Sequence, residues 1–332
     1  MPWKATAARL INAFVRRYDI RVVRGADLWR PAMQLGRQPE PPAPAPDTAR
    51  SDPFFQNYIG ESIGALQIPF DFTVVMPTTL RSTIRDAIES VFAQDLPGRV
   101  QLLIGVDAPR GDLHLVEQAC RKVPPHHAVQ LFYPGYSTSR RHGGAHPAWD
   151  GGALRTILSY LANSRYVAYL DDDNWYAENH LSSQYEALQG HDWAYSLRWF
   201  VHPASRRPIC VDRWEAIGPV PQGTAVDPAG WVDPNCLAID KLACEAVLRW
   251  WGIPQRNNTH AMDADRNVYR VLRTEFNGRG TDEATVFYTM AESDRFRHPF
   301  RLEMIGAERY ASAGVANDAA RVAEVQHGEP QS

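Results

Sequence analysis

Apolar and polar positions follow two distinct rhythms from residue 68 onward. Short runs of consecutive apolar residues predict buried strands, and segments in which apolar residues recur every three or four positions predict amphipathic helices. The predicted strands are 72–76, 100–106, 128–133 and 166–170, and the predicted helices are 82–93, 113–122 and 153–161. Strands and helices that alternate in this way favour an α/β fold with a mainly parallel sheet and helices on both faces.

The second half of the chain has a less regular pattern. Residues 193–201 and 207–214 predict a β-hairpin, and residues 218–234 predict a loop. Two helices are predicted at 242–251 and 262–276, and the second of these opens with two aspartates. We place the end of the folded domain at about residue 310.

Both flanks differ in composition from the region between them. Residues 4–18 combine apolar side chains at helical spacing with basic side chains at other positions, and residues 38–46 are rich in proline. The expected division is an N-terminal extension at 1–66 with a helix and a linker, an α/β domain at 67–310 and a flexible tail at 311–332. The helix at 4–18 packs on the protein or a partner, or it contacts an anionic membrane surface, and the pattern leaves both alternatives open.

Composition restricts the class of protein. A hydrophobic content of 44% and a charged content of 22% are typical of globular proteins. The formal net charge of -3 argues against a partner that is nucleic acid. Four widely spaced cysteines, no secretory signal and no apolar run of about 20 residues predict a soluble cytoplasmic protein with reduced thiols. Peripheral contact with the inner face of the membrane through residues 4–18 is an added option.

The fourth predicted strand ends in three consecutive acids, Asp171, Asp172 and Asp173. Aspartates crowded in this way repel one another unless a cation or a basic partner compensates their charge. Mg²⁺ and Mn²⁺ prefer carboxylate oxygens and often share their coordination with substrate phosphates. The first and third acids are therefore candidate metal ligands. The alternative is that Asn174 or Asp173 caps a helix that begins near Ala177.

Other polar positions also fall at predicted strand ends. Pro77, Thr78 and Thr79 follow the first strand, and Asp107 follows the second. Ligands of parallel α/β sheets bind beyond the carboxyl ends of the strands, where the strand order switches direction. We therefore expect these residues to lie near the three acids.

In motif order and spacing, residues from about 68 to 305 resemble glycosyltransferase family 2, whose members are inverting enzymes with a GT-A (Rossmann-like) fold. Residues 72–79 resemble the family's first strand and nucleotide loop, and residues 103–107 resemble its second strand. Residues 169–174 resemble its metal motif. Residues 261–265 stand where the family places the acid that serves as catalytic base. The resemblance covers about 70% of the chain.

The resemblance implies a metal-dependent glycosyltransferase that moves a sugar from a nucleotide-diphosphate donor to an acceptor hydroxyl, in polysaccharide or glycoconjugate synthesis. It implies Mn²⁺ or Mg²⁺ as cofactor, held by Asp171 and Asp173. The implied donor contacts are Pro77, Thr78, Thr79, Asp107, Arg140, Arg141 and Asp172. The two arginines suit diphosphate because a guanidinium can donate two parallel hydrogen bonds, but the alternative is a solvated pair. The acceptor, whether glycan, lipid or protein, stays open.

Two acids compete for the role of base, because Met262 stands where the family usually has an acid. Either Asp263 or Asp265 would take the proton from the acceptor hydroxyl, and either also suits the start of the helix. His260 and His298 are candidate third metal ligands, with a structural role as the alternative.

Three other functions stay open. A glycoside hydrolase would use two facing carboxylates without a metal. A nucleotidyltransferase would use a similar sheet and cation, but the chain has no Gly-rich loop with a lysine after its first strand. A catalytically inactive GT-A-like scaffold would bind a nucleotide without turnover, although the presence of all three acids argues against lost activity.

Overall fold

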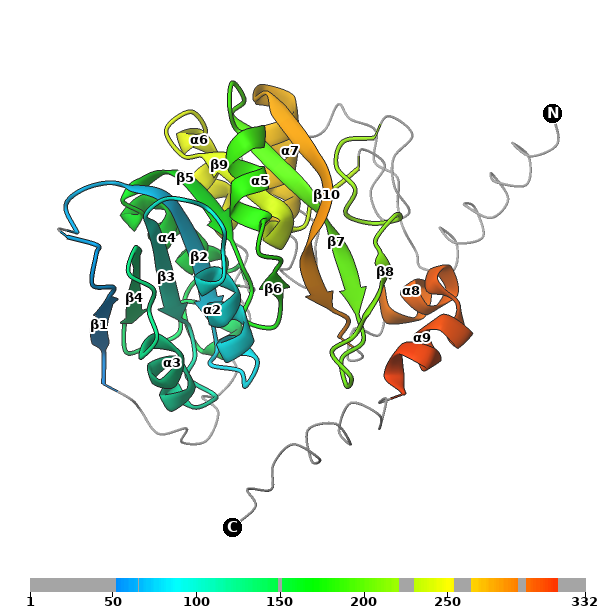
Figure 1. The fold of residues 1–332 in the computed structure, drawn as a ribbon, viewed down its shortest axis with the longest axis horizontal. Coiled ribbons are helices and arrows are strands. Elements are labelled where there is room, and N and C mark those ends of the chain that lie inside the picture. Colours follow the sequence, from blue (N-terminus) through cyan, green and yellow to red (C-terminus); the bar gives the residue numbers. More distant parts are fainter. Residues whose placement is uncertain are drawn as a thin grey trace, which may run out of the picture. The chain divides into compact units, whose positions relative to one another are not determined.

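Ten strands among the described residues join in one mixed sheet, with helices packed against it (Figure 1). The structure is a computed structural model that describes residues 52–64, 66–148, 151–220, 230–253, 264–291 and 297–315. All of these residues belong to one compact unit of the chain. The helix expected at 4–18, the linker at 38–46, Asp263 and the tail beyond residue 315 lie outside the described residues.

The order of elements follows the alternation predicted from the sequence in the first half of the chain. The strands are β1 (Phe54–Ile59), β2 (Phe70–Thr78), β3 (Val100–Val106), β4 (His127–Tyr133), β5 (Ser164–Tyr169), β6 (Trp175–Tyr176), β7 (Trp193–Val201), β8 (Pro208–Val211), β9 (Leu237–Asp240) and β10 (Gly278–Thr289). The helices are α2 (Ile84–Phe92), α3 (Leu113–Cys120), α4 (Gly152–Leu161), α5 (His180–Ala187), α6 (Glu245–Leu248), α7 (Ala264–Glu275), α8 (Arg297–Ile305) and α9 (Ala307–Gly314). Short 3₁₀ turns lie at η2 (Arg140–His142), η3 (Pro234–Cys236) and η4 (Arg249–Gly252).

Four parallel strands form the first half of the sheet in the order β4-β3-β2-β5. Nearly every residue of β2 and β3 is buried, as expected of strands covered on both faces. The chain moves from β2 to β4 in one direction and returns to β5 on the other side of β2. Right-handed crossovers therefore place α2 and α3 on one face and α4 on the other. This arrangement confirms the predicted α/β fold.

The hydrophobic core lies between this sheet and its helices. Phe72, Val74 and Met76 of β2 are fully buried, and burial of such a side chain contributes roughly 1.5–3 kcal/mol. On the α4 face, Gly105 of β3 leaves room for Leu158, because a Cβ at this glycine would lie 2.8 Å from the leucine Cδ1. None of the helices in the described ranges has the length and apolarity that crossing a bilayer requires.

Antiparallel pairs connect the second half of the sheet to the first. β9 pairs with β5 and β7, and β6 pairs with β10, while β10 runs parallel to β7. β8 pairs with β7 in antiparallel orientation, which confirms the predicted hairpin. β7 and β10 lie side by side at the centre of Figure 1. The sheet therefore extends well beyond the parallel strands that the sequence pattern indicated.

Several elements differ from the sequence prediction. β1 lies within residues 1–66, which were assigned to the N-terminal extension, but it pairs with β4, so the sheet begins earlier than expected. The acids are followed by β6 rather than by a helix near Ala177, and α5 begins at His180 with Asn179 as its N-cap residue. Neither Asn174 nor Asp173 therefore caps this helix. The helix predicted at 242–251 divides into α6 and η4, and α9 continues to Gly314, past the expected start of the tail.

Candidate active site

A cavity of about 300 Å³ opens at the carboxyl ends of β2 and β5, where the strand order switches direction. This is the position at which open α/β sheets bind their ligands. The predicted site residues that line it are Pro77, Thr78, Thr79, Asp107, Arg141, Asp171, Asp172 and Asp173. The sequence analysis missed Arg81, His142, Gly151, Arg155, Asn174 and Tyr288, which also line it. The expected convergence of strand ends on one site is therefore observed.

Asp172 connects the acid turn to the end of β2. Its carboxylate is almost fully buried, and Oδ2 accepts a 2.6 Å hydrogen bond from Thr78 Oγ1. The same threonine oxygen accepts a 2.7 Å hydrogen bond from the Leu80 backbone N–H. Leu80 adopts φ 63°, a left-handed conformation that turns the chain sharply after the strand. Thr78 therefore lines the cavity and also holds the middle acid, Asp172, in place.

Asp171 is held by residues from two distant elements. Arg155, in the first turn of α4, forms an ion pair with its Oδ1, and the arginine side chain is only 6% exposed. Asn235 accepts a 2.6 Å hydrogen bond from the Asp171 N–H and donates one of 3.0 Å to its Oδ2. The start of α4 requires Gly151, whose φ is 69° and where a Cβ would lie 2.6 Å from Pro77 Cβ. The glycine therefore brings the helix, and Arg155 with it, against the end of β2.

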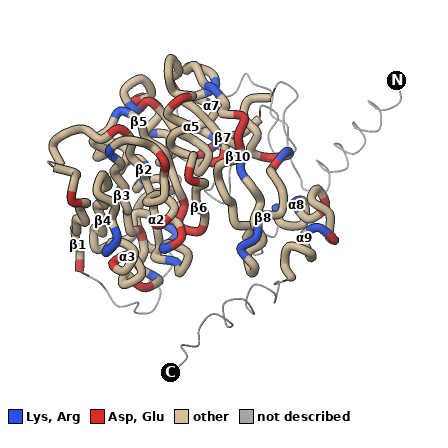
Figure 2. The backbone as a smooth tube through the Cα atoms, in the orientation of Figure 1, with Lys and Arg blue, Asp and Glu red and all other residues tan. Residues whose placement is uncertain are grey.

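Asp173 has an unusual charge environment. Burial, together with repulsion from Asp171 and Asp172, raises the pKa of Asp173 to about 7, although an ion pair with Arg81 opposes this shift. About a third of its side chain remains accessible from the cavity, so solvent screening moderates the repulsion. Acidic and basic segments accordingly lie next to each other near α2 and β6 in Figure 2. A cation at this turn would relieve the remaining excess of negative charge.

The donor atoms suit a hard divalent cation shared with a ligand. Asp171 and Asp173 are 31% and 34% exposed, whereas Asp172 is 3% exposed and turned toward Thr78. No three His, Cys, Asp or Glu side chains within the described ranges are grouped as a complete metal cage. Mg²⁺ commonly uses one or two carboxylates and completes its shell with water and substrate phosphates. The two outer carboxylates fit this mode of binding.

His298 does not line the cavity. It lies on α8, where its ring packs edge-on against Tyr310 with centroids 5.6 Å apart. Its placement gives no support to the prediction that it is a metal ligand, so we leave it out of the candidate metal site. His260 lies outside the described residues.

Asp107 already has protein partners. Its Oδ1 accepts hydrogen bonds of 2.8 and 2.7 Å from the N–H and Oγ1 of Thr138, and its Oδ2 accepts one of 3.0 Å from Ser137 Oγ. The aspartate therefore positions the turn that leads to η2. Oδ1 thus accepts two hydrogen bonds, whereas Oδ2 accepts one and keeps a second lone pair for a ligand in the cavity.

The two adjacent arginines have different surroundings. Arg141 lines the cavity, whereas Arg140 does not and instead begins the η2 turn. His142 belongs to the same turn, and its Nδ1 lies 2.7 Å from Nη2 of Arg110, in the segment after β3. Burial together with this guanidinium lowers the pKa of His142. The predicted diphosphate contact is thus compatible with the position of Arg141 but not supported for Arg140.

Of the two candidate bases, only Asp265 can be placed. It lies in the first turn of α7, where its Oδ1 accepts a 2.9 Å hydrogen bond from the Arg266 N–H. It also interacts electrostatically with Arg297. Asp265 does not line the cavity, and Asp263 lies outside the described residues. The choice of base therefore stays open.

Residues from the second half of the sheet fix the far side of the acid turn. Asn174 Oδ1 accepts a 2.9 Å hydrogen bond from the Thr289 N–H, and Thr289 Oγ1 donates one of 2.6 Å to the Asp173 carbonyl. Arg206 Nη1 donates to the same threonine oxygen at 2.9 Å. The acids are thus held between the end of β2 and the end of β10.

A buried ionic network lies behind the cavity. Arg198 is fully buried and forms ion pairs with Asp212, Glu215 and Asp233, and Arg301 of α8 also pairs with Glu215 at 2.8 Å. The guanidinium carbons of Arg198 and Arg301 lie 4.1 and 5.1 Å from the ring centroid of Tyr288, which lines the cavity. Asp233 accepts from Asn235, the partner of Asp171, at 2.7 Å. The network therefore connects the docking of α8 to the position of the first acid.

No family model and no curated protein matches the chain. Among solved structures it is similar to S. aureus TarS 1-349, with 12% identity and a TM-score of 0.46 over 66% of this chain and 60% of that chain. It is also similar to the mannosyltransferase PcManGT from Pyrobaculum calidifontis in complex with GDP-Man and Mn²⁺, with 13% identity and a TM-score of 0.46 over 74% of this chain and 63% of that chain. The chain thus spans less than two thirds of these solved chains. Likeness at this level does not assign a function.

Proposed function

We propose that the protein is an inverting, metal-dependent glycosyltransferase of the GT-A type that uses a nucleotide-sugar donor. One observation carries the proposal: three consecutive carboxylates, a Pro-Thr-Thr loop and three arginines line one cavity at the switch point of an α/β sheet. Carboxylates suit a divalent cation, and arginines suit phosphate oxygens. A nucleoside diphosphate linked to a sugar requires both.

Asp171 and Asp173 would hold Mn²⁺ or Mg²⁺, since their carboxylates face the cavity. The bound cation supplies positive charge that stabilises the diphosphate leaving group. Asp172, turned away and hydrogen-bonded to Thr78, keeps the turn in place while its two neighbours bind the ion.

Arg81, Arg141 and Arg155 would bind the diphosphate. Without a donor, Arg81 and Arg155 pair with Asp173 and Asp171 and offset the repulsion between the acids. Once a cation neutralises these carboxylates, the guanidinium groups can donate to phosphate oxygens instead. Two of the three phosphate-binding residues in this proposal were not predicted from the sequence.

Thr79 and Asp107 line the cavity just after β2 and β3 and would contact the nucleoside, with Asp107 accepting through the remaining lone pair of Oδ2. Asp263 or Asp265 would remove the proton from the acceptor hydroxyl as its oxygen attacks the anomeric carbon. Attack from the side opposite the leaving diphosphate inverts the configuration at that carbon.

A thermal-shift panel of nucleoside diphosphates and nucleotide sugars, with and without Mn²⁺, tests the proposal. A ligand at 100 times its Kd stabilises the folded state by about 2.7 kcal/mol. We expect a Mn²⁺-dependent rise in Tm with one nucleobase, and its loss in Asp173→Ala. Asp95→Ala serves as the control, because Asp95 is an exposed acid outside the cavity.

The same panel, together with assays for released nucleotide and sugar, separates the alternatives. A Mn²⁺-dependent shift without release of sugar or nucleotide in the presence of glycan acceptors would identify an inactive scaffold. Retention of both metal-dependent binding and transfer in Asp173→Ala would contradict the proposed site. Hydrolysis of a glycan without any divalent ion would favour a glycoside hydrolase.

A further inference from the structure

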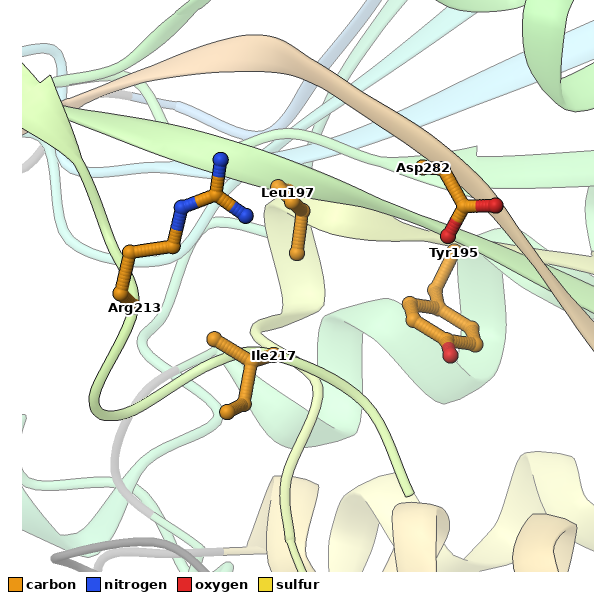
Figure 3. A pocket seen from close by; sticks show the side chains of 5 residues that line it. All are labelled: Tyr195, Leu197, Arg213, Ile217 and Asp282. Carbon is orange, nitrogen blue, oxygen red and sulfur yellow. The ribbon is translucent and has the colours of Figure 1, made fainter. Parts of the chain in front are cut away.

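A second cavity, of about 240 Å³, lies between β7, β10 and the segment that follows β8 (Figure 3). Tyr195 and Leu197 come from β7, Asp282 from β10, and Arg213 and Ile217 from the segment after β8. In Figure 3 these side chains surround an open space, with Asp282 beside Tyr195 on one side and Arg213 on the other. None of them belongs to the proposed active site.

Two glycines leave the space that the Tyr195 ring occupies. A Cβ at Gly218 would lie 2.3 Å from Tyr195 Cε2, and a Cβ at Gly280 would lie 2.9 Å from its Cζ. The ring also stacks on Trp193, with centroids 5.6 Å apart and planes inclined by 30°. Any other residue at either glycine would displace the ring, so the local sequence is suited to presenting this aromatic surface.

Asp282 points into the cavity because of an irregularity in β10. The pairing of β10 with β7 shifts register between Gly280 and Ala284, and Asp282 adopts φ 60°. A left-handed conformation of this kind is unfavourable for most residues other than glycine, and Asp is among the few that adopt it. Bulges frequently redirect a side chain near a binding site. The bulge therefore presents the carboxylate of Asp282 beside Tyr195.

The polar side chains of this cavity have no hydrogen-bond or ion-pair partners among the described residues. Within the described part of the chain, neither Arg213 nor Asp282 forms an ion pair or a side-chain hydrogen bond, and the Tyr195 hydroxyl makes no hydrogen bond. Both side chains are exposed, so water solvates their opposite charges and leaves them free to bind a ligand. Burial and the nearby Asp282 raise the pKa of Tyr195, so its hydroxyl remains a hydrogen-bond donor.

We propose that this cavity is a carbohydrate-binding subsite that takes one sugar ring of a glycan acceptor. An aromatic face flanked by Leu197 and Ile217 suits the C–H surface of a pyranose. The carboxylate of Asp282 accepts hydrogen bonds from sugar hydroxyls, and the guanidinium of Arg213 donates to them. Drug-sized ligands occupy about 300–1,000 Å³, so the smaller volume suits a single ring.

The position of the subsite indicates a polymeric acceptor, an inference that rests on the proposed function. Tyr288 of the donor cavity lies six positions beyond Asp282 on β10, and the bulge between them makes the path shorter than the roughly 20 Å that an extended strand would span at 3.3 Å per residue. Tyr195 and Leu197 alternate along β7 with Arg198 and Phe200, which pack on Tyr288, so the two cavities lie on opposite faces of this strand. A monosaccharide cannot touch both cavities, whereas a chain of several sugars can. Contacts far from the reacting atoms supply binding energy that positions the acceptor hydroxyl.

The test is a titration of the full-length protein with soluble hexasaccharides of glucose, mannose, xylose and N-acetylglucosamine, followed by calorimetry. The variants are Tyr195→Ala, Arg213→Gln and Asp282→Gly. The last removes the carboxylate but favours the left-handed backbone, so it keeps the fold. Arg273→Gln and Glu303→Gln are controls at exposed positions outside the cavity. We expect one hexasaccharide to bind and each cavity variant to weaken it about tenfold, with both controls unchanged.

The outcomes distinguish the subsite from the proposed function. Hexasaccharide binding that all three cavity variants leave unchanged, or no binding of any hexasaccharide, overturns the subsite. A Mn²⁺-dependent nucleotide shift in the same preparations would then leave the glycosyltransferase proposal intact. Binding that the variants weaken, without any nucleotide response, supports the subsite and contradicts the proposed function. In an active preparation, the variants should raise KM for the hexasaccharide without changing KM for the donor.

Discussion

Thr78 Oγ1 and Asp172 Oδ2 are joined by a buried 2.6 Å hydrogen bond that connects the end of β2 to the acid turn after β5. The threonine also accepts from the Leu80 N–H, so a single hydroxyl fixes both strand ends at the cavity. The acids keep their position because the neighbouring strand supplies a donor to the middle carboxylate.

Replacing this threonine should weaken both the fold and the site. In Thr78→Val the buried carboxylate loses its donor and the Leu80 N–H loses its acceptor, which should lower the free energy of unfolding by about 1.5–3 kcal/mol. Urea denaturation measures this loss, and the nucleotide-dependent shift in Tm should fall in parallel. Thr274→Val, at an exposed helical position, should stay within about 0.5 kcal/mol of the wild type. Equal stabilities of the two variants would show that the hydrogen bond contributes little.

The two candidate bases can be separated by kinetics. If Asp263 is the base, Asp263→Asn should bind the donor with an unchanged Kd and lose nearly all turnover, because an amide cannot accept the proton. Asp265→Asn should then mainly affect the start of α7, where Asp265 accepts from the Arg266 N–H. Single-turnover rates and donor titrations of both variants decide the question. Loss of turnover in Asp265→Asn alone would assign the base to Asp265.

The ionic network behind the cavity should be sensitive to loss of its central cation. Arg198→Met leaves Asp212, Glu215 and Asp233 buried beside one another, and breaking a buried pair typically costs about 3–5 kcal/mol. Arg273→Met, at an exposed position of α7, is the matched control. Chemical denaturation compares the two. A loss of less than about 1 kcal/mol in Arg198→Met would mean that the network does not hold α8 and the Asp233 segment in place.

Two buried histidines predict that acid destabilises the protein. Burial lowers the pKa of His127 to about 4 and that of His180 to about 3, whereas an unfolded chain titrates near 6.5. Both states are neutral above pH 6.5. As the pH falls from 6.5 toward 4, only the unfolded chain takes up protons at these residues, so the free energy of unfolding decreases.

The expected loss at pH 5 is up to about 2 kcal/mol for each histidine. His180→Gln should therefore show a shallower dependence of stability on pH between 6.5 and 5, even if its stability at pH 8 is lower. Urea denaturation at several pH values measures the slope. A slope equal to that of the wild type would mean that His180 becomes protonated in the native state.

The strands of the first half could be predicted because their apolar runs are continuous. Strand β3 was predicted with the bounds that the structure shows, 100–106. A strand that is buried on both faces forms a continuous apolar run, whose ends are clear in the sequence. β1 was missed because alternate residues are exposed at the sheet edge, where the run looks like part of a linker. β6 has two residues, too few for any periodicity.

The site could be predicted where a motif is local and not where it depends on the fold. Asp171 and Asp173 stand out as neighbours of an apolar strand. Arg155 is an ordinary helical arginine in the sequence, and its pairing with Asp171 exists only because Gly151 brings α4 against Pro77. Asn235 is 64 positions from Asp171, and no spacing rule connects them. The residues that position the acids could therefore be identified only from the structure.

The anchors of the acid turn lie far away along the chain, which bears on how the protein is made. Thr78 precedes Asp172, to which it donates, by 94 positions, and Thr289 follows Asp173, to which it donates, by 116. A chain emerging from the ribosome exposes the three aspartates long before β10 has been synthesised. Contacts of such separation form late in folding. A product truncated before β10 would carry the complete motif but should bind no nucleotide, so the motif in a shortened chain is not a sign of a working enzyme.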